Sequence, residues 1–472
     1  MTTVDLPNQA AFEVLDTQAT LQALQDIVGD RVSATDADRS HHSRDQSSHS
    51  AGLPDFVVWP KSTAEASAVL RYANEVRLPV TAWGAGTSLE GNPIPIRGGL
   101  VLSFQRMNQI LEIYHTDFQV RVQPGILYKD MNDILGREGL FFAPDPGANA
   151  SIGGMIANNA AGTRTVKYGA TRDNVLTLEV VLADGRVVRT GSRSVKQSSG
   201  YDLTHLFVGS EGTLGVVTEA TLRLAPLPEY LSAVVAAFPD VPTAAAVVYT
   251  VMASGVEPAA LEILDASAMQ ILNGAEGFDF VDAPHLLMEF HGTSEAALGE
   301  ELELVEEICR DFDSLDYRAG VGRDARDHLW RARHRLFESM RRTFPGDSYL
   351  ITDVAVPISN YPKLAATAAE SIAERDAKGS IIGHAGDGNL HTTIFFSPDD
   401  VVARRRAAEV NDLLVARALE LEGTSTGEHG IGIGKQKYML MEHGEIALDL
   451  MRQLKATLDP NGILNPGKIL AL

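Results

Sequence analysis

The feature that most restricts the fold is a long segment of small residues, PDPGANASIGGMIANNAAGTRTVKYGATRDNV, at residues 144–175. Gly, Ala, Ser and Asn dominate it, and bulky apolar residues are few before Val166. We expect this segment not to build a core through side-chain volume. Instead its backbone can lie closely against something flat, with Asn158 and Asn159 as hydrogen-bonding groups. GSEGTLGVVTE, at residues 209–219, repeats the same chemistry.

A further glycine-rich stretch, WGAGTSLEGNP at residues 83–93, directly follows a predicted strand. Leu89 stands where a dinucleotide-binding G-x-G-x-x-G fingerprint needs a glycine, and the stretch is not a G-x-x-x-x-G-K-[ST] phosphate loop either. A loop with Thr87 and Ser88 can still turn backbone N–H groups toward an anion. A plain tight turn is an equal alternative for this stretch taken alone.

Composition excludes several classes of protein. The 472 residues predict two to four domains, and 40 basic against 62 acidic residues give a net charge of −22. Such a field repels phosphate backbones, so we expect no nucleic-acid partner. The single cysteine, Cys309, excludes an intrachain disulfide and a cysteine-based zinc cluster. The sequence has no run of about 18 apolar residues, so we expect no transmembrane helix and no integral membrane contact. We therefore expect a cytoplasmic protein, and peripheral docking at the inner membrane face stays open.

Alternating strand and helix patterns fill the first half of the chain. A helix is expected over residues 10–29, followed by a solvated loop at 34–50 whose three histidines have no ligand partner at a regular spacing. Ser62 and Glu65 form an S-x-x-E capping box for the next helix. Residues 177–191 read as a hairpin with Asp184-Gly185 as a two-residue turn.

The pattern of strands and helices continues after Pro226 and Pro228. Strands are expected at LSAVVAAF, LEIL and HLLMEF, with helices near 241–254 and at 294–312. These units predict a second α+β domain, built as a ferredoxin-like pair of repeats. TDVAVP, a helix at 361–377 and a hairpin complete it, and a helix at 400–422 follows.

The three glycine-rich segments, in this order, resemble the FAD-binding domain of the vanillyl-alcohol oxidase/p-cresol methylhydroxylase family. The resemblance implies FAD that wraps its pyrophosphate on the first loop and lies along the second segment. No histidine or cysteine occurs between residues 83 and 93, so the bound FAD is expected to be non-covalent. The implied FAD-binding residues are Trp83, Gly84, Ala85, Gly86, Thr87, Ser88, Leu89, Gly91, Asn92, Pro144, Asp145, Gly147, Ser151, Gly153, Gly154, Asn158, Asn159, Gly162, Glu211, Val216 and Val217.

GHAGDGNLH, at residues 383–391, predicts a second kind of site. If Asp387-Gly388 forms a type I′ turn, residues whose numbers sum to 775 face each other, and His384 and His391 meet this condition. Opposed Cβ atoms lie about 4.5–5.5 Å apart, which lets two imidazoles reach one metal ion. Two ordinary histidines beside a turn are the alternative. GEHGIGIGK, at residues 427–435, adds Glu428 and His429 between glycines as further candidates.

GHAGDGNLH, GEHGIG and the closing NPGKIL resemble the C-terminal domain of FAD-linked 2-hydroxyacid dehydrogenases, a group with D-lactate dehydrogenase (cytochrome), D-2-hydroxyglutarate dehydrogenase and the flavin subunit of glycolate oxidase. The resemblance implies His384, His391 and Glu428 as ligands of a divalent metal, zinc or manganese. It implies His429 as the base, Arg333 as the anchor of the substrate carboxylate, and Asn465 as a residue that returns to the flavin. Arg331 and Arg335 are expected on a solvated face.

Together the two resemblances imply a two-subdomain FAD-binding domain at 51–228, after a lead-in at 1–50. A ferredoxin-like α+β substrate (cap) domain at 229–425 follows. The chain then ends in a C-terminal helical segment at 426–472, which is expected to return to the flavin. The expected reaction oxidises a small D-2-hydroxyacid to its 2-oxoacid, with hydride passing from C2 to the flavin N5. Electrons then reach a separate acceptor, and a quinone, a cytochrome or an electron-transfer flavoprotein would serve.

Two residues bear on the substrate. D-2-hydroxyglutarate dehydrogenases place a lysine where Ile351 stands and an asparagine where Thr393 stands, so the resemblance favours a substrate without a second carboxylate, D-lactate before glycolate. Two rival functions stay open. A redox-neutral transferase like alkylglycerone-phosphate synthase would carry consecutive histidines, whereas His429 stands alone. The other rival is a noncatalytic flavin-binding subunit. The oligomeric state, a homodimer among the options, is not readable.

Overall fold

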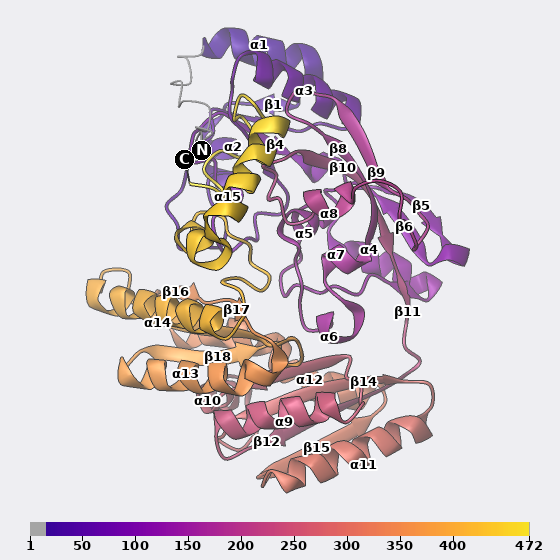
Figure 1. The fold of residues 1–472 in the computed structure, drawn as a ribbon, viewed down its shortest axis with the longest axis vertical. Helices are drawn as coiled ribbons and strands as arrows, with labels where there is room; N and C mark the ends of the chain where they lie inside the picture. Colours follow the sequence, from indigo (N-terminus) through magenta and orange to yellow (C-terminus); the bar gives the residue numbers. More distant parts are fainter. Residues whose placement is uncertain (1–15, 472) are drawn as a thin grey trace. The chain divides into compact units, whose positions relative to one another are not determined.

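The computed structural model describes residues 16–471, which divide into two compact units (Figure 1). Unit 1 contains the chain up to Ala161, then Ala170–Leu227 and the chain from Glu428 onward. Unit 2 contains Gly162–Gly169 and Pro228–Gly427. The first part of the helix expected at 10–29 lies outside the described residues. Between residues 16 and 471, no helix is long and apolar enough to cross a membrane.

Unit 1 contains two main sheets with helices around them (Figure 1). Its helices are α1 (Thr17–Val28), α2 (Asp36–His41), α3 (Thr63–Glu75), α4 (Tyr128–Leu135), α5 (Ile152–Asn158), α7 (Thr171–Asn174), α8 (Leu203–Phe207) and α15 (Met439–Leu458). Its strands are β1 (Val32–Ser33), β2 (Phe56–Val58), β3 (Val80–Trp83), β4 (Leu100–Ser103), β5 (Ile110–Tyr114), β6 (Gln119–Val122), β7 (Leu140–Phe141), β8 (Val175–Val181), β9 (Val187–Gly191), β10 (Val216–Arg223) and β11 (Ala225–Pro226).

The smaller main sheet of unit 1 has the order β1-β2-β4-β3, and β2 and β3 both run parallel to β4. The larger is antiparallel, with the order β5-β6-β10-β8-β9. Helix α3 begins as expected at Ser62, whose hydroxyl accepts from the N–H of Glu65. The capping box is only half formed, because the Glu65 carboxylate instead accepts from the guanidinium of Arg31 and the N–H of Lys61.

Two sequence predictions about local structure in unit 1 were wrong. The β8–β9 hairpin has a three-residue loop, since Leu182 pairs with Arg186 and Gly185 donates to Leu182. Gly185 takes a left-handed conformation with φ +82°, as a bulge after a type I turn requires. The solvated loop expected at 34–50 contains α2, and His42 is buried against the rings of Trp59 and Trp83.

The segment of small residues also contributes to a core, contrary to the sequence prediction. Ile152, Met155 and Ile156 lie on one face of α5 and are buried in the apolar cluster of unit 1. Helical spacing therefore gathers the few bulky residues of this segment on one side. Gly154 and Asn158 of the same segment line the site described below, and so does Met155.

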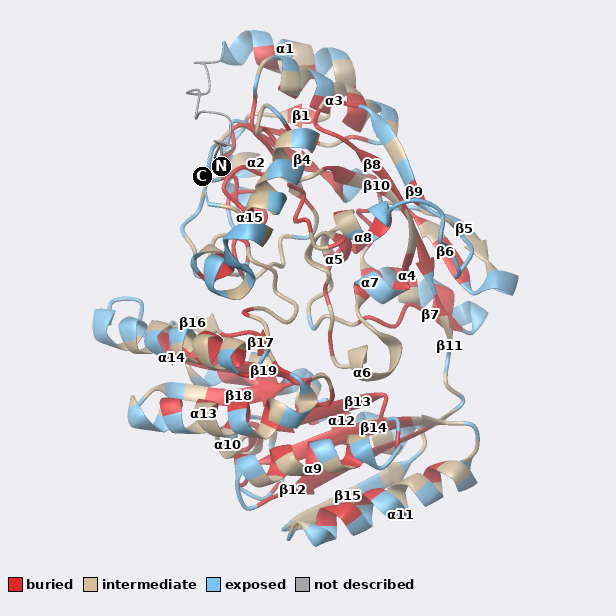
Figure 2. Cartoon of the chain, viewed as in Figure 1, coloured by how far each residue is buried: buried red, intermediate tan, exposed pale blue. Residues whose placement is uncertain are grey.

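Unit 2 is an antiparallel sheet covered by helices, and most of its strand residues are buried (Figure 2). Its helices are α6 (Thr165–Tyr168), α9 (Val241–Ala253), α10 (Ala266–Glu276), α11 (Glu295–Asp311), α12 (Arg323–Thr343), α13 (Tyr361–Glu374) and α14 (Val401–Glu420). Its strands are β12 (Tyr230–Ala237), β13 (Ala260–Leu264), β14 (His285–Gly292), β15 (Asp316–Val321), β16 (Ser348–Ile351), β17 (Val354–Ala355), β18 (Lys378–Gly383) and β19 (Asn389–Phe396).

The strand order of this sheet, β15-β12-β14-β13-β18-β19-β16, contains the predicted pair of repeats. Strands β12 to β15 have the spatial order 4-1-3-2 of a complete ferredoxin-like unit, with α9 and α11 as its crossovers. Strands β16, β18 and β19, with α13 and α14, repeat the unit without its fourth strand. Chain order thus places β13, β18 and β19, which carry the polar residues of the second site, side by side at the join between the repeats.

Candidate active site

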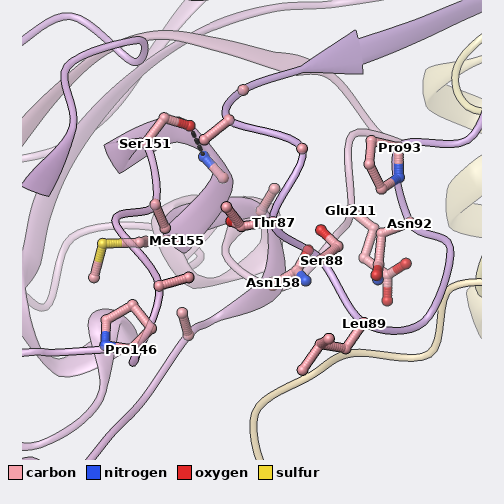
Figure 3. A pocket seen from close by; sticks show the side chains of 18 of the residues that line it. Thr87, Ser88, Leu89, Asn92, Pro93, Pro146, Ser151, Met155, Asn158 and Glu211 are labelled. Carbon is pink, nitrogen blue, oxygen red and sulfur yellow. Dashed lines mark hydrogen bonds between the residues drawn. The ribbon is translucent and has the colours of Figure 1, made fainter. Parts of the chain in front are cut away.

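Unit 1 contains a pocket lined by the glycine-rich loop after β3 and by the first residues of α5 (Figure 3). Including the open space at its mouth, the pocket encloses about 970 Å³. Many lining residues are glycine or alanine, so the walls are largely backbone and methyl groups. Such walls suit a flat, extended group that approaches the main chain closely.

Gly84 and Gly86 show why two positions of this loop carry no side chain. A Cβ atom at residue 84 would lie 2.1 Å from the Ser151 hydroxyl oxygen, which caps α5 by accepting from the N–H of Gly154. Gly86 has φ +68°, and a Cβ there would lie 2.7 Å from the Trp83 ring. Position 86 therefore requires glycine, and position 84 could carry a side chain only if Ser151 moved. The cradle that the two glycines leave fits FAD.

Thirteen of the predicted FAD-binding residues line this pocket: Gly84, Ala85, Gly86, Thr87, Ser88, Leu89, Asn92, Gly147, Ser151, Gly154, Asn158, Glu211 and Asn465. The other nine are not among the lining residues: Trp83, Gly91, Pro144, Asp145, Gly153, Asn159, Gly162, Val216 and Val217. Trp83 and Val216 are buried in apolar clusters, and Gly162 belongs to unit 2. Lining residues that were not selected from the sequence include Pro146, Ala150, Met155 and Ala157. Helical spacing would have indicated Met155, four residues after Ser151, and Ala157, three after Gly154.

Glu211 holds the segment that carries Glu428 and His429. Its buried carboxylate accepts from the N–H groups of Ile431, at 2.6 Å, and Gly432, at 2.9 Å. Burial raises the pKa of Glu211, and these hydrogen bonds oppose the rise. Glu211 was implied as an FAD-binding residue by the resemblance, and no pattern in the sequence indicated this second role.

Glu428 and His429 both line the unit 1 pocket. Asn158 donates to the His429 carbonyl oxygen at 3.2 Å, which fixes the backbone of this segment against α5. The His429 Nε2 lies 3.8 Å from a Glu428 carboxylate oxygen. His429 is therefore placed beside the cradle for the flat group, where a base is expected to act. Asn465 donates to the carbonyl oxygens of Asn92 and Glu211 and so holds the same wall.

In unit 2 the β18–β19 hairpin brings His384 and His391 together, but not in the predicted register. Paired residues sum to 773, so His391 faces Ile382, and His384 lies opposite Asn389. The type I′ turn is replaced by a short 3-10 turn, Ala385–Asp387, with Gly388 alone in the left-handed region at φ +73°. The histidines are therefore diagonal neighbours on one face of the hairpin. Both are buried, and their ring centroids are 5.3 Å apart.

Each of these histidines directs one ring nitrogen to an acceptor in unit 2. His384 Nδ1 donates to Glu262 at 2.6 Å, and His391 Nδ1 donates to the carbonyl oxygen of Thr352 at 3.1 Å. A metal-binding imidazole usually makes such a bond through its other nitrogen, which leaves Nε2 as the ligand atom. The donor set thus fits a divalent metal of the zinc or manganese kind.

Arg333 lies on α12 and donates through Nε to the second oxygen of Glu262 at 2.7 Å. Burial alone would raise the pKa of Glu262, but the charges and hydrogen bonds of His384 and Arg333 outweigh it and lower the pKa. Arg335 is half exposed and pairs with Glu338, whereas Arg331 lies over the ring of Phe278. The interaction with Glu262 therefore sets Arg333 apart from both neighbouring arginines.

Covalent geometry connects Glu428 to this part of unit 2. Gly427, the last residue of unit 2, packs so closely there that a Cβ atom would lie 2.3 Å from the Asn389 side chain and 2.8 Å from Asp353. Consecutive Cα atoms are about 3.8 Å apart. Glu428 is therefore bonded directly to a residue that packs against β19, the strand that carries His391.

Ile351 and Thr393, the two residues expected to bear on substrate size, are direct partners across β16 and β19. Thr393 is two residues from His391, so both side chains leave the strand on the same face. Neither Ile351 nor Thr393 carries a charge. Residues 351 and 393 therefore place no positive charge beside His391 on this face of the sheet.

Comparisons with known proteins identify the class. The family model "FAD linked oxidases, C-terminal domain" matches residues 227–469, and the model "FAD binding domain" matches residues 54–191. The chain therefore belongs to the family of FAD-linked oxidases, and it has an FAD-binding domain.

Within that family the chain is an enzyme similar to D-lactate dehydrogenases and to a glycolate oxidase subunit. It is 41% identical to "Probable D-lactate dehydrogenase, mitochondrial" of Danio rerio, over 96% of this chain and 92% of the relative. Identity is 40% to "D-lactate dehydrogenase [cytochrome], mitochondrial" of Arabidopsis thaliana, over 95% and 80%. It is 38% to "Glycolate oxidase subunit GlcD" of Bacillus subtilis, over 93% of each chain.

Solved structures confirm the fold. The 4-ethylphenol oxidase from Gulosibacter chungangensis matches with a TM-score of 0.77 at 19% identity, over 96% of this chain and 97% of the other. p-Cresol methylhydroxylase matches with a TM-score of 0.75 at 18% identity, over the same shares. The predicted α+β fold, with an FAD-binding domain of the vanillyl-alcohol oxidase/p-cresol methylhydroxylase type, is therefore confirmed.

Proposed function

We propose that this chain oxidises a small D-2-hydroxyacid, D-lactate before glycolate, to the 2-oxoacid with FAD and a divalent metal. The observation that carries the proposal is the buried group of Arg333, Glu262 and His384 with His391 beside it, in a chain whose relatives bear the names of D-lactate dehydrogenases. When bound, FAD supplies a two-electron acceptor and the metal supplies Lewis acidity.

Arg333 has the role of the substrate anchor in this proposal. Its Nε donates to Glu262, so its two terminal nitrogens keep the planar fork that matches a carboxylate. Glu262 fixes the guanidinium plane before the substrate arrives. A bidentate pair orients the substrate as well as binding it, which fits the 2-hydroxyacid class.

His429 takes the proton of the 2-hydroxyl group. It lines the pocket assigned to FAD, and Asn158 fixes its backbone, so the imidazole is held on a rigid wall. His384, His391 and Glu428 ligate the metal. In support, both histidines donate a hydrogen bond through Nδ1, which leaves Nε2 for the metal. Gly427, the residue before Glu428, packs against the strand of His391.

A substrate with one carboxylate fits this chain better than one with two. Ile351 and Thr393 provide an apolar and a neutral side chain on the His391 face, where a second carboxylate would need a cation. The proposal therefore favours D-lactate over D-2-hydroxyglutarate. Electrons pass to a separate acceptor, for which a quinone, a cytochrome and an electron-transfer flavoprotein are all suitable.

A substrate panel tests the proposal. The purified flavoprotein is mixed anaerobically with D- and L-2-hydroxyacids, before and after treatment with a chelator, and the visible spectrum is recorded. Bleaching by D-lactate that stops on metal removal and returns with Mn²⁺ or Zn²⁺ is expected. Bleaching that survives complete metal removal overturns the metal role, and a colourless protein that binds no added FAD overturns the whole proposal.

A further inference from the structure

Glu262 lies between two residues to which the proposed function gives different tasks. It is fully buried, at 0% exposure, in the centre of β13. We propose that Glu262 is a positioning residue that couples the substrate anchor Arg333 to the metal ligand His384. This inference rests on the proposed function, and it adds a residue that neither touches substrate nor ligates metal.

The geometry gives each oxygen of Glu262 its own partner. One oxygen accepts from His384 Nδ1 at 2.6 Å, and the other accepts from Arg333 Nε at 2.7 Å. Arg333 belongs to α12 and His384 follows β18, so three elements meet at one carboxylate. Movement of the carboxylate toward either partner lengthens its bond to the other.

For His384 the contact decides which nitrogen carries the proton. A carboxylate accepts only, so Nδ1 must be the N–H and Nε2 the ligand atom. His391 obtains the same tautomer from the backbone carbonyl oxygen of Thr352 at 3.1 Å. Loss of the Glu262 charge should therefore disturb one histidine of the pair and leave the other correctly oriented.

For Arg333 the contact decides the plane of the guanidinium. One hydrogen bond through Nε fixes the direction in which the two terminal nitrogens point, and a fork recognises a carboxylate only when it is so aligned. The buried negative charge also offsets the cost of holding a guanidinium that is only partly exposed. Substrate binding and metal binding consequently depend on the same anion.

The isosteric substitution Glu262→Gln separates this role from simple packing. An amide offers one oxygen and one NH₂ group, so it can accept from one partner but turns a donor toward the other. Removal of a hydrogen bond to a metal-binding histidine typically weakens metal affinity about 10–100-fold. We expect E262Q to bind metal about 10–100-fold more weakly and to raise the substrate KM, with a smaller effect on kcat.

The chain offers a matched control at Glu289, on the neighbouring strand β14. Glu289 is also buried, accepts from Arg326 of α12 at 2.7 Å, and contacts His291 at 2.7 Å. It pairs with Ala260 and so shares the face of the sheet that carries Glu262. E289Q should thus lower stability as E262Q does, while metal affinity stays at the wild-type value.

The experiment is a calorimetric titration of Mn²⁺ into the metal-depleted, FAD-bound protein. Thermal unfolding and the KM for D-lactate of the metal-loaded protein are recorded for every variant. Wild type, E262Q, E262D and E289Q are compared. E262D keeps the charge but is one methylene shorter and cannot reach both partners at once, so it should lose Mn²⁺ affinity, substrate affinity or both. If E262Q does not fold, E262D alone tests the coupling.

The outcomes separate the two proposals. Weaker Mn²⁺ binding with a raised KM in E262Q, a loss of either in E262D, and wild-type Mn²⁺ binding in E289Q support the coupling. Wild-type Mn²⁺ affinity and KM in the folded Glu262 variants overturn the coupling and leave the proposed function standing. An equal loss in E289Q means that general destabilisation is the cause, which also overturns it. A wild-type protein that binds no Mn²⁺ or Zn²⁺ overturns the metal role, and the coupling with it.

Discussion

Gly84 provides the sharpest structural prediction for flavin binding. In Gly84→Ala the added methyl carbon would lie 2.1 Å from the Ser151 hydroxyl oxygen, whereas ordinary contacts begin near 3.4 Å. The Ser151 side chain must therefore move by more than about 1 Å, and it then loses its bond to the N–H of Gly154. Loss of an N-cap costs about 0.5–2 kcal/mol, and both the added methyl group and the moved hydroxyl belong to residues that line the FAD cradle.

The G84A protein is expected to lose both thermal stability and FAD affinity. Thermal unfolding of the FAD-free protein should begin a few degrees lower, at about 2–4 °C for each kcal/mol. An intrusion that costs about 1–3 kcal/mol in a packed site weakens FAD binding about 5–150-fold. Fluorescence titration of FAD into the apoprotein measures this directly.

Gly147→Ala is the matched control for G84A. Gly147 lines the same pocket, but a Cβ there meets no protein atom within 4 Å, so the FAD-free protein should keep its wild-type unfolding temperature. G84A protein with wild-type FAD affinity and wild-type unfolding temperature would refute the reasoning, because the clash would then cost nothing.

Three further predictions concern Arg333 and Glu289 of unit 2 and His429 of unit 1. R333Q should lower kcat/KM for the hydroxyacid about 100-fold, as loss of charge-assisted hydrogen bonds implies, while R335Q, at an exposed position, leaves it unchanged; steady-state kinetics with an artificial acceptor decides. H429Q should keep FAD but slow flavin reduction about 10²–10⁴-fold, and stopped-flow absorbance that shows the wild-type rate would exclude His429 as the base. Contacts with His291 and Arg326 outweigh burial and lower the pKa of Glu289 from 4.5 to about 2, so its stabilisation of about 3 kcal/mol is present above pH 4.5 and lost as the pH falls toward 2. Acid unfolding monitored by circular dichroism should be less steep with pH in E289Q, and an unchanged profile would contradict the assignment.

Periodicity and turn chemistry predicted the elements of this chain well where the local pattern decides structure. The ferredoxin-like repeats of unit 2 follow from strand and helix order alone. A helical C-terminal segment was predicted without the bounds of helix α15, and the loop at 34–50 proved to contain a helix and the buried His42. Packing on Trp59 and Trp83 decides the burial of His42, and that contact cannot be read from spacing.

The histidine hairpin shows the limit of register arguments. A two-residue turn predicts direct opposition of His384 and His391, but the 3-10 turn changes the sum of paired numbers by two. The two histidines nevertheless meet, because a shift of two residues keeps a side chain on the same face of a sheet. A shift of one would have separated them.

Glu262 is the residue that the sequence analysis missed most clearly. It stands in an apolar strand 122 residues before His384, and no spacing rule connects the two. A charged residue inside a buried strand is itself a signal, since such a side chain needs a partner. Arg333, in contrast, was selected only through resemblance, because α12 carries several arginines at similar spacing.

The most direct test of the central claim is an anaerobic absorbance titration of the purified flavoprotein with D-lactate, with D-2-hydroxyglutarate in a parallel cuvette. The account predicts that D-lactate bleaches the flavin band within the first turnover and that D-2-hydroxyglutarate leaves the band intact. Neither Ile351 nor Thr393 carries a positive charge that would pair with a second carboxylate. Rapid bleaching by D-2-hydroxyglutarate, with no response to D-lactate, would contradict it.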